Sequence, residues 1–432
     1  MSYPRFPNYH KKLDMITEYL RLKHEYGNPE TQKLADKLER AMDALYEEAK
    51  SLPVDEALAL KEPNGLEEIR ALRPAGPRKL DLDEGTFADK LEGAFLSRMA
   101  GCVLGAPVEF YSVEDMKNWA AYNGDAFPPT DYWSRVKFPG LLRYNFSDCT
   151  AYTKDGMKTV PVDDDITYTI LGLLIAEEHG VNFTVDDVGQ TWLKYLPCAC
   201  TAEEVALNNL KAGVSPMEAA DVDNPYCQWI GADIRSDPFA YMAPAYPEKA
   251  AALAYTDAYL SHRRNGIYGE MFFAAAQSAA FAVDSAKAAL EIGLTEIPAG
   301  CALAKDVRWA LEVADTVTGY EMARDLVDRR FAGMSGVHTN LNACLTIFSL
   351  ILGGSDMTRV ISEAVAMGMD NDCTAATAGS IVGAIIGKKN VPEHWYKNFN
   401  NTVDTYLTGT EPFKIDDLMR RFTALARETR KN

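Results

Sequence analysis

The segment VDDDITYTILGLLIA, residues 162–176, places three consecutive aspartates before an apolar run typical of a buried helix. A second segment, GMDNDCTAATAGSIVG, residues 368–383, places two aspartates before another such run. In both segments the carboxylates stand where the N-terminal amides of the helix point, and the helix dipole offsets only roughly 0.3–1 kcal/mol per charge. Adjacent carboxylates repel more strongly than that, so the two segments indicate a bound cation.

Aspartates at these positions can also serve without a metal. Asp is a preferred N-cap residue, so Asp163 or Asp370 would also serve as the cap of the helix that follows it. Runs of charge are commonly solvated as well. An EF-hand calcium site is disfavoured, because neither segment has the twelve-residue ligand spacing or its terminal Glu. Two such clusters, each before a helix-like run, favour metal binding.

The composition predicts a large globular protein. The 432 residues are 47% hydrophobic, and the formal net charge of −18 argues against a general nucleic-acid surface or an anionic-membrane surface. We find no transmembrane segment and no signal-peptide pattern, so we expect a cytoplasmic protein. The eight cysteines show no CxxC or zinc-ribbon spacing.

The first 85 residues predict a helical extension, and residues 86–432 predict the main domain. Two amphipathic helices are expected in the extension, the first over residues 11–26 and the second after Asn28. We find no chemistry in this region. At the other end of the chain, residues 395–406 and 415–427 predict two closing helices.

Small residues recur at every fourth position of two segments, which predicts a ridge of minimal side chains on each helix. They are Gly93, Ser97, Gly101 and Gly105 in the first segment and Gly379, Gly383 and Gly387 in the second. Such ridges let helices approach closely, so we expect the two helices to lie near one another in the core, although each ridge would also fit another partner. Core packing does not explain Glu109, which follows the first ridge.

Six segments taken together resemble the ADP-ribosylglycohydrolase family, from about residue 86 to the C-terminus. Each motif is weak alone, and their order and spacing carry the resemblance. The segments are GAFLSRMAGCVLGAPVE (93–109), DDD (163–165), IGADIR (230–235), SHRRNGIYGE (261–270), GVHTNLNA (336–343) and GMDND (368–372).

The resemblance implies an all-α, orthogonally packed multi-helix domain with a two-magnesium centre, in which Mn²⁺ is a possible substitute. The family pattern has a Thr-Asp-Asp run, and Asp163 stands here where that pattern has Thr. The second pattern, Asp-x-Asp-Thr/Ser, has Cys373 where a hydroxyl residue is usual. The residues expected to bind metal are Asp163, Asp164, Asp165, Asp370, Asp372 and Thr374.

The departure at Cys373 leaves one ligand open. A thiol is a poor ligand for a hard cation, which prefers oxygen. We expect either the Thr374 hydroxyl or a water molecule to complete the metal site.

The resemblance further implies hydrolysis of a bond at C1 of a ribose. Two divalent ions would hold the ribose hydroxyls and a water, and the oxocarbenium-like transition state requires a nearby carboxylate. Glu109 resembles the catalytic or gating glutamate of the family and would orient the water or the leaving group. The residues expected to line the substrate site are Gly231, Arg235, His262, Asn265, His338 and Asn342.

An aromatic and proline-rich stretch lies between Glu109 and Asp163. It predicts either a lid or wall of the ribose site, with ring faces that stack a base, or an excursion packed into a surface groove. Its prominent residues are Trp119, Tyr122, Phe127, Pro128, Pro129, Tyr132, Trp133, Phe138, Tyr144 and Phe146.

The leading prediction is therefore a magnesium-dependent hydrolase of an ADP-ribosylated or ribonucleoside-like substrate. The departures at Asp163 and Cys373 keep open a ligand-binding or structural protein of the same fold, and a phosphohydrolase is a third possibility. The sequence does not identify the aglycone, decide between a modified protein and a small molecule, or give the oligomeric state.

Overall fold

The computed structural model describes residues 3–4, 6–136 and 149–431. The chain forms two compact units, one made of residues 1–60 with 331–334 and the other of residues 61–330 with 335–432. None of the helices among the described residues has the length and apolar character needed to cross a membrane.

The first unit contains the two helices expected at the N-terminus. Helix α1 spans Tyr9–Glu25 and α2 spans Thr31–Lys50, and the two helices contact one another. The short helix α3, Glu56–Ala59, follows. The side chain of Asn8 caps α1 by accepting a hydrogen bond from the Lys11 amide at 3.0 Å.

The second unit is mostly helical, which confirms the predicted all-α class. Its helices are α4 (Leu66–Leu72), α5 (Glu84–Gly105), α6 (Val113–Asn123), α8 (Asp164–His179), α9 (Val185–Tyr195), α10 (Thr201–Lys211), α11 (Ser236–Met242), α12 (Pro247–Ala258), α13 (Asn265–Ala280), α14 (Ala286–Gly293), α15 (Ala302–Ala314), α16 (Tyr320–Arg330), α17 (Thr339–Gly353), α18 (Met357–Met367), α19 (Asn371–Ile386) and α20 (Ile415–Lys431). Strands β1 (Thr402–Val403) and β2 (Phe413–Lys414) form a small antiparallel sheet.

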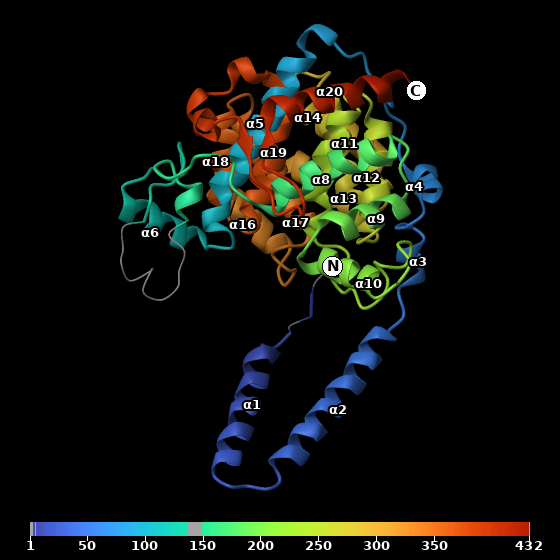
Figure 1. The fold of residues 1–432 in the computed structure, drawn as a ribbon, viewed down its shortest axis with the longest axis vertical. Helices are drawn as coiled ribbons and strands as arrows, with labels where there is room; N and C mark the ends of the chain where they lie inside the picture. The colour runs from blue at the N-terminus through green and yellow to red at the C-terminus, as the bar shows by residue number, and fades with distance from the viewer. Residues whose placement is uncertain (1–2, 5, 137–148, 432) are drawn as a thin grey trace. The chain divides into compact units, whose positions relative to one another are not determined.

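Helices α5 and α19 pack backbone to backbone through the two predicted ridges (Figure 1). A Cβ added at Gly101 would lie 2.2 Å from the carbonyl oxygen of Ala375, and one at Gly383 would lie 2.3 Å from that of Gly93. Side chains larger than hydrogen are therefore excluded at these crossings. The expectation that the two helices lie together in the core is confirmed.

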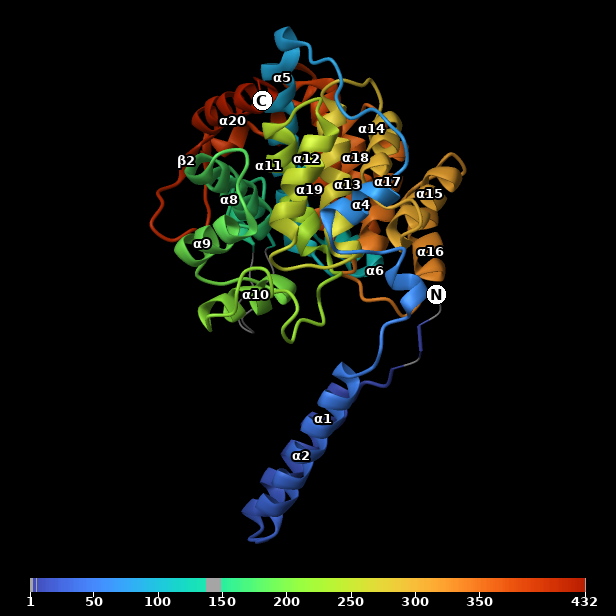
Figure 2. The same cartoon turned by 90° about the vertical axis from the view of Figure 1, so that its right-hand side faces the viewer.

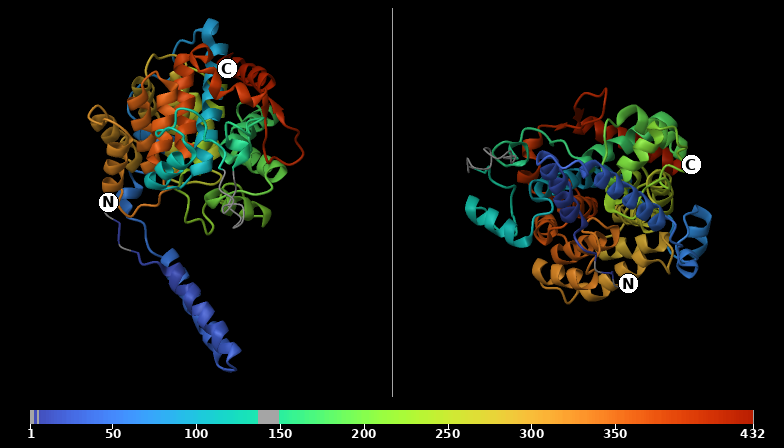
Figure 3. Two further views of the ribbon diagram at one scale, coloured as in Figure 1. Left: turned by 90° about the vertical axis from the view of Figure 1, so that its left-hand side faces the viewer. Right: turned by 90° about the horizontal axis from the view of Figure 1, so that it is seen from below.

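Other helices of the second unit surround this pair. Helix α18 packs on α19, and α13 packs on α12 and α14, as Figure 2 shows. The C-terminal helix α20 packs on α11, and Figure 3 shows it in dark red at the edge of the unit. Its apolar residues Ile415, Leu418 and Phe422 are buried, and the expectation of a closing helix over residues 415–427 is confirmed.

Residues 61–83 belong to the second unit. The buried carboxylate of Glu62 accepts hydrogen bonds from Asn265 at 3.1 Å and from the Ala302 amide at 2.8 Å. The compact unit begins at Lys61, and the domain boundary after residue 85 stays a prediction.

One sequence expectation differs from the structure. Residues 395–406 form short 3₁₀ turns and strand β1 instead of a helix. The aromatic stretch contains helix α6, which Ser112 caps at its start and Gly124 ends with a φ of 77°. Within residues 395–406, Asn400 (φ 47°) and Asn401 (φ 53°) take left-handed conformations that a continuous right-handed helix does not contain.

We predict that Gly101→Ala lowers the free energy of unfolding by about 1–3 kcal/mol or more, where about 1–3 kcal/mol is the usual cost of overpacking a core. Its Cβ would meet the backbone of Ala375, which cannot swing aside. Thermal or denaturant unfolding measures the change. Gly319→Ala is the control, since no described atom lies within 4 Å of its added Cβ. Equal stability of the two variants would contradict the close packing of α5 and α19.

Candidate metal centre and substrate cavity

The two acidic clusters meet at the start of helices α8 and α19. Donor atoms within each of three groups lie within 4.8 Å of one another. The groups are Glu109, Asp370 and Asp372; Asp165, Asp372 and Cys373; and Cys102, Asp163 and Asp165. Residues that are far apart in sequence thus form one continuous set of candidate metal ligands, because Asp372 and Asp165 each belong to two groups.

Asp163 is the N-cap of helix α8. Its carboxylate accepts a hydrogen bond from the Asp165 amide at 3.0 Å. The predicted capping role therefore holds for Asp163, which leaves the rest of its carboxylate free of helix hydrogen bonds. Asp164 and Asp165 occupy the first turn of α8, where the helix dipole favours negative charge.

Capping does not account for the second cluster. Asp370 is the N-cap of α19, but its side chain makes no capping hydrogen bond. The Oδ1 atoms of Asp370 and Asp372 are buried and have no hydrogen-bond partner among the described residues. Gly368 (φ 70°) and Met369 (φ 64°) take left-handed backbone conformations that turn the chain into α19.

Glu109 reaches the second cluster from the end of helix α5. A 3₁₀ turn, Ala106–Val108, follows α5, and the Phe110 amide then donates to the Met369 carbonyl at 3.0 Å. This hydrogen bond ties the loop of Glu109 to the loop that begins α19. The Glu109 carboxylate is half-buried beside Asp370 and Asp372.

Burial and mutual repulsion raise the pKa of these carboxyl groups. Burial, then the charges of Asp370 and Asp164, raise the pKa of Glu109 to about 8. Burial also raises the pKa of Asp165 to about 8 despite the nearby Arg98, and that of Asp370 to about 6. Without bound cations these carboxyl groups therefore retain protons, and bound cations would balance the negative charge in their place.

Among the described residues, Arg98 supplies the only guanidinium shown to contact the carboxylates that are candidate metal ligands. It lies on α5 with no exposure, and its Nη2 donates to Asp165 Oδ1 at 3.2 Å and to the Ile234 carbonyl at 2.6 Å. Its Nη1 forms an ion pair with Asp237 at 2.8 Å. Arg98 lies in a motif of the family resemblance, but the sequence analysis assigns it no role. The signal that could have identified it is a lone arginine inside an apolar helix.

The structure brings Cys373, and not Thr374, to the carboxylates. The Cys373 thiol donates to Asp165 Oδ2 at 3.0 Å. The Thr374 hydroxyl donates instead to the Asn371 carbonyl of its own helix at 3.3 Å. Neighbouring positions on a helix point about 100° apart, so only one of the two faces Asp165. Metal binding by Thr374 stays a prediction that this geometry does not favour.

A cavity of about 550 Å³ opens beside the carboxylates. Glu109, Asp163, Asp164, Asp370 and Cys373 line one part of it. The opposite part is a wall formed by residues 229–231 and Val337, which the Ile230 amide ties together by donating to the Val337 carbonyl at 2.9 Å. Gly231 lines this cavity, as expected from the sequence.

Arg235 does not face the cavity and has a different environment from the one expected. Its side chain is buried and forms ion pairs with Glu203 at 2.9 Å and with Asp257. It also donates to Ser261 at 3.1 Å. An arginine with these partners holds helices α10 and α12 to the turn that precedes α11, so a direct phosphate contact is not supported.

The other four expected substrate residues serve the framework around the cavity. The His262 ring contacts Ser261 at 2.8 Å, and Asn265 donates to Gln228 at 2.8 Å. His338 caps α17, and Asn342 donates to the His338 carbonyl at 3.1 Å. None of the four is among the residues that line the cavity. His338 is tied to the wall, because it forms a β-bridge with Trp229, and Thr339, next to it, donates to the Trp229 carbonyl.

The aromatic stretch divides into a packed part and a part that lines a second cavity. Tyr132 and Trp133 are buried and donate to the carbonyls of Trp395 and Leu104, so this part is a packed excursion. Phe138, Tyr144 and Phe146 lie outside the described residues. A cavity of about 590 Å³ is lined by Phe110, Tyr111, Asp115, Trp119, Tyr122, Asn123 and Val136.

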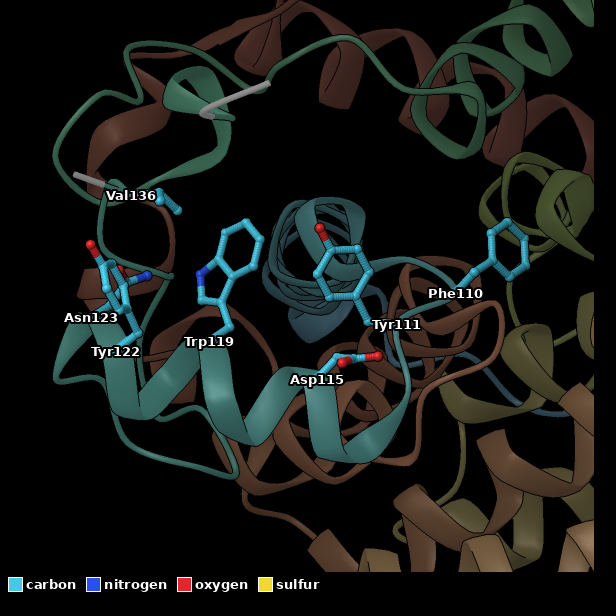
Figure 4. A pocket seen from close by; sticks show the side chains of 7 residues that line it. All are labelled: Phe110, Tyr111, Asp115, Trp119, Tyr122, Asn123 and Val136. Atoms are coloured by element: carbon cyan, nitrogen blue, oxygen red, sulfur yellow. The ribbon is translucent and has the colours of Figure 1, made fainter. Parts of the chain in front are cut away.

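Figure 4 shows the aromatic rings of this second cavity in a row above helix α6, from Tyr122 through Trp119 and Tyr111 to Phe110. The rings of Tyr111 and Trp119 meet edge to face with centroids 5.5 Å apart. The Trp119 Nε1 atom is buried without a hydrogen-bond partner among the described residues. Phe110 lines both cavities, so they are neighbours.

The residues present fit a group of divalent cations. Buried carboxylate oxygens without donors, such as Oδ1 of Asp370 and Asp372, are costly unless a cation or proton satisfies them. The donors converge within bridging distance and adjoin a cavity, which gives a cation and a substrate access to the same place. Such an arrangement is suited to metal-ion catalysis on a ligand held in the cavity.

Comparison with known proteins agrees with the arrangement. Residues 83–431 match the family model described as ADP-ribosylglycohydrolase. Among solved structures, one described as an "ADP-ribosylglycohydrolase-related protein complex" is similar with a TM-score of 0.53 and 18% identity, over 79% of this chain and 99% of that chain. At this identity the likeness shows the fold alone. No curated protein matches the chain.

We predict that stability without divalent cations falls as the pH rises from about 4 to about 8. The pKa values of Glu109 and Asp165 are raised to about 8, whereas unfolded carboxyls titrate at about 4. The folded state therefore binds more protons in this window and loses that stabilisation as pH rises. Added Mg²⁺ should raise the unfolding temperature more near pH 8 than near pH 5.

Scanning fluorimetry with chelator or with Mg²⁺ measures both effects. At a concentration of 100 Kd, a bound ion stabilises by about 2.7 kcal/mol. The Asp372→Asn variant should show a weaker pH dependence in chelator and a smaller gain with Mg²⁺. An Mg²⁺ gain that is equal at both pH values would refute the linkage.

Proposed function

Because the chain belongs to the ADP-ribosylglycohydrolase family, we propose that it is a magnesium-dependent hydrolase that cleaves an N- or O-glycosidic bond at C1 of a ribose. Its substrate would be an ADP-ribosylated compound or a ribonucleoside-like compound. The observation that carries this proposal is the grouping of Glu109 with Asp370 and Asp372 beside a cavity of about 550 Å³.

The metal ligands of this chain would be the carboxylates of Asp163, Asp164, Asp165, Asp370 and Asp372. Two divalent cations bound there would supply orientation of the ribose hydroxyls and stabilisation of negative charge. The three groups of donors, which share Asp372 and Asp165, agree with adjacent ion positions. Mn²⁺ is expected to substitute for Mg²⁺.

Glu109 is the candidate catalytic residue. Burial raises the pKa of Glu109, and cations bound by Asp370 and Asp164 would offset the part of this rise that comes from their charges, which leaves a carboxyl group able to accept or donate a proton at the reacting bond. The hydrogen bond from the Phe110 amide to Met369 holds the Glu109 backbone against the acidic cluster. In this position Glu109 would orient the attacking water or protonate the leaving group.

The row of rings above α6 is the proposed contact for a flat aglycone. Phe110 adjoins both cavities, so a group that leaves C1 on the side of Glu109 would reach Tyr111 and Trp119. An acceptor atom on that group would satisfy the buried Trp119 Nε1. Stacking on such rings is tolerant of the identity of the base.

A ligand-binding member of the same fold is the alternative function. The observation that favours it is the thiol of Cys373 beside Asp165, a donor that hard cations do not prefer. Tight binding of a riboside without turnover would support this alternative. Release of inorganic phosphate would instead support a phosphohydrolase.

We predict that Glu109→Gln lowers kcat by about 100-fold or more, the usual contribution of general acid–base catalysis. The glutamine side chain keeps the shape of the glutamate and one of its oxygen atoms. The increase in unfolding temperature that Mg²⁺ produces should therefore stay close to that of the wild type. Release of ribose or ADP-ribose from a panel of ribosides measures turnover, and a chelator should abolish it.

The matched control for this substitution is Glu114→Gln. Glu114 is an exposed glutamate in the first turn of α6, where the same change should not alter kcat. Unchanged turnover in Glu109→Gln would show that Glu109 is not catalytic. Turnover that persists after complete chelation would show that the reaction does not depend on a metal ion.

We predict that Trp119→Ala raises KM roughly tenfold for ribosides with an aromatic aglycone, because stacking contributes about 1–3 kcal/mol per base. Ribosides with a non-aromatic aglycone should be affected much less. Trp119→Phe keeps a ring face and removes the N–H, so it should recover most of the loss. Equal effects on both substrate classes would show that the rings only support the fold.

A further inference from the structure

The candidate metal centre combines two kinds of donor set. One group, Glu109 with Asp370 and Asp372, contains only oxygen donors. A second group, Asp165 with Asp372 and Cys373, contains a sulfur donor. Asp372 belongs to both groups, so the two sets are adjacent and chemically unequal.

The Cys373 thiol is buried among the carboxylates of the candidate metal centre. Cys373 is in the first turn of α19 and is 6% exposed, and Asp165 and Asp372 are 0% and 3% exposed. The Cys373 Sγ lies 3.0 Å from Asp165 Oδ2. A sulfur atom in this position is close enough to share an ion with the carboxylates.

A separate observation points to a ligand at the same place. The Oδ1 atom of Asp372 is buried without a hydrogen-bond partner among the described residues, and so is that of Asp370, which is 5% exposed. A buried carboxylate oxygen that lacks a donor requires a cation or a proton. The guanidinium of Arg98 satisfies part of the Asp165 carboxylate and leaves this oxygen of Asp372 without a donor.

Thiolate ligands favour borderline and soft ions, and affinity for mixed nitrogen, oxygen and sulfur sites rises from Mn²⁺ through Co²⁺ towards Zn²⁺. Mg²⁺ requires oxygen ligands and keeps its own water. We infer that the position formed by Asp165, Asp372 and Cys373 selects a divalent transition-metal ion, with Zn²⁺ as the best fit, while Mg²⁺ takes the adjacent position, where Asp370 and Asp372 supply oxygen ligands beside the catalytic Glu109. This inference rests on the proposed metal-dependent function.

Binding at the sulfur-containing position breaks the S–H bond of Cys373 and forms a sulfur–metal bond. The thiol proton passes to the buffer, together with any proton that the Asp165 or Asp372 carboxyl group holds, and the oxidation state of the ion does not change. The hydrogen bond from Cys373 to Asp165 is then replaced by shared coordination, which removes the contact of a thiol with a carboxylate.

The test uses Co²⁺ as a spectroscopic probe of the whole chain under reducing conditions, after removal of divalent ions with a chelator. A thiolate bound to Co²⁺ gives a charge-transfer absorption in the near ultraviolet, which oxygen ligands do not give. The wild type should show this band at a stoichiometry of one thiolate per ion, and Zn²⁺ should displace it. Mg²⁺ at millimolar concentration should not.

Cys373→Ser should lose the band, and Cys344→Ser is the matched control. Cys344 is also a buried free cysteine, but its thiol donates to the Asp306 carbonyl on another side of the unit. By calorimetry, Cys373→Ser should weaken Zn²⁺ binding by at least about 10–100-fold, the usual loss when even a supporting partner of a metal ligand is removed. Its Mg²⁺ affinity should not fall.

The other possible results of these experiments contradict either this inference or the proposed metal-dependent function. If Co²⁺ binds the wild type without the band, or if Cys373→Ser keeps the band, then Cys373 is not a ligand. The wild-type spectrum decides this even if the variant does not fold. If Mg²⁺ binds and ribosides are cleaved without any thiolate band, the inference fails alone. If no divalent cation binds, the proposed function fails with it.

Discussion

The close approach of helices α5 and α19 is the constraint on which the rest of the second unit depends. Glycines on both helices bring backbone against backbone, and a Cβ at Gly105 would lie 2.4 Å from the Cα of Asp372. The last turn of α5 is therefore seated on the first turn of α19. Because Glu109 follows the first of these turns and Asp370 precedes the second, helix packing alone brings the candidate catalytic group to the candidate metal ligands.

The same packing brings several carboxylates together, and their mutual repulsion bears on the function. Five aspartates and Glu109 gather where Arg98 is the nearest positive charge shown to contact them. Burial raises the pKa of several of these groups, so without a cation they retain protons. Arg98 comes from α5 and bonds to Asp165 and Asp237, which couples helix packing to the geometry of the site. A fold that tolerates this repulsion is suited to holding cations beside a substrate.

The sequence predicted which acidic residues gather at one place better than it predicted the walls of the cavity. Gly231 lines the cavity, but Arg235 from the same motif is buried in an ionic network with Glu203 and Asp257. His262 and Asn265 likewise lie among framework contacts. A motif shows that a turn belongs near the substrate, but neighbouring positions on a turn point to opposite sides. Only the partners from distant helices decide which of them faces the ligand.

The sequence by itself determined the helical class, the two ridges of small residues and the two clusters of aspartates, because periodicity and spacing are local properties of the chain. The tertiary structure decided that Cys373 and not Thr374 faces Asp165, that Arg98 is the counter-charge and that Phe110 adjoins both cavities. These outcomes depend on the rotation of one helix against another. That rotation is set by the sum of contacts across the core, which no single segment encodes.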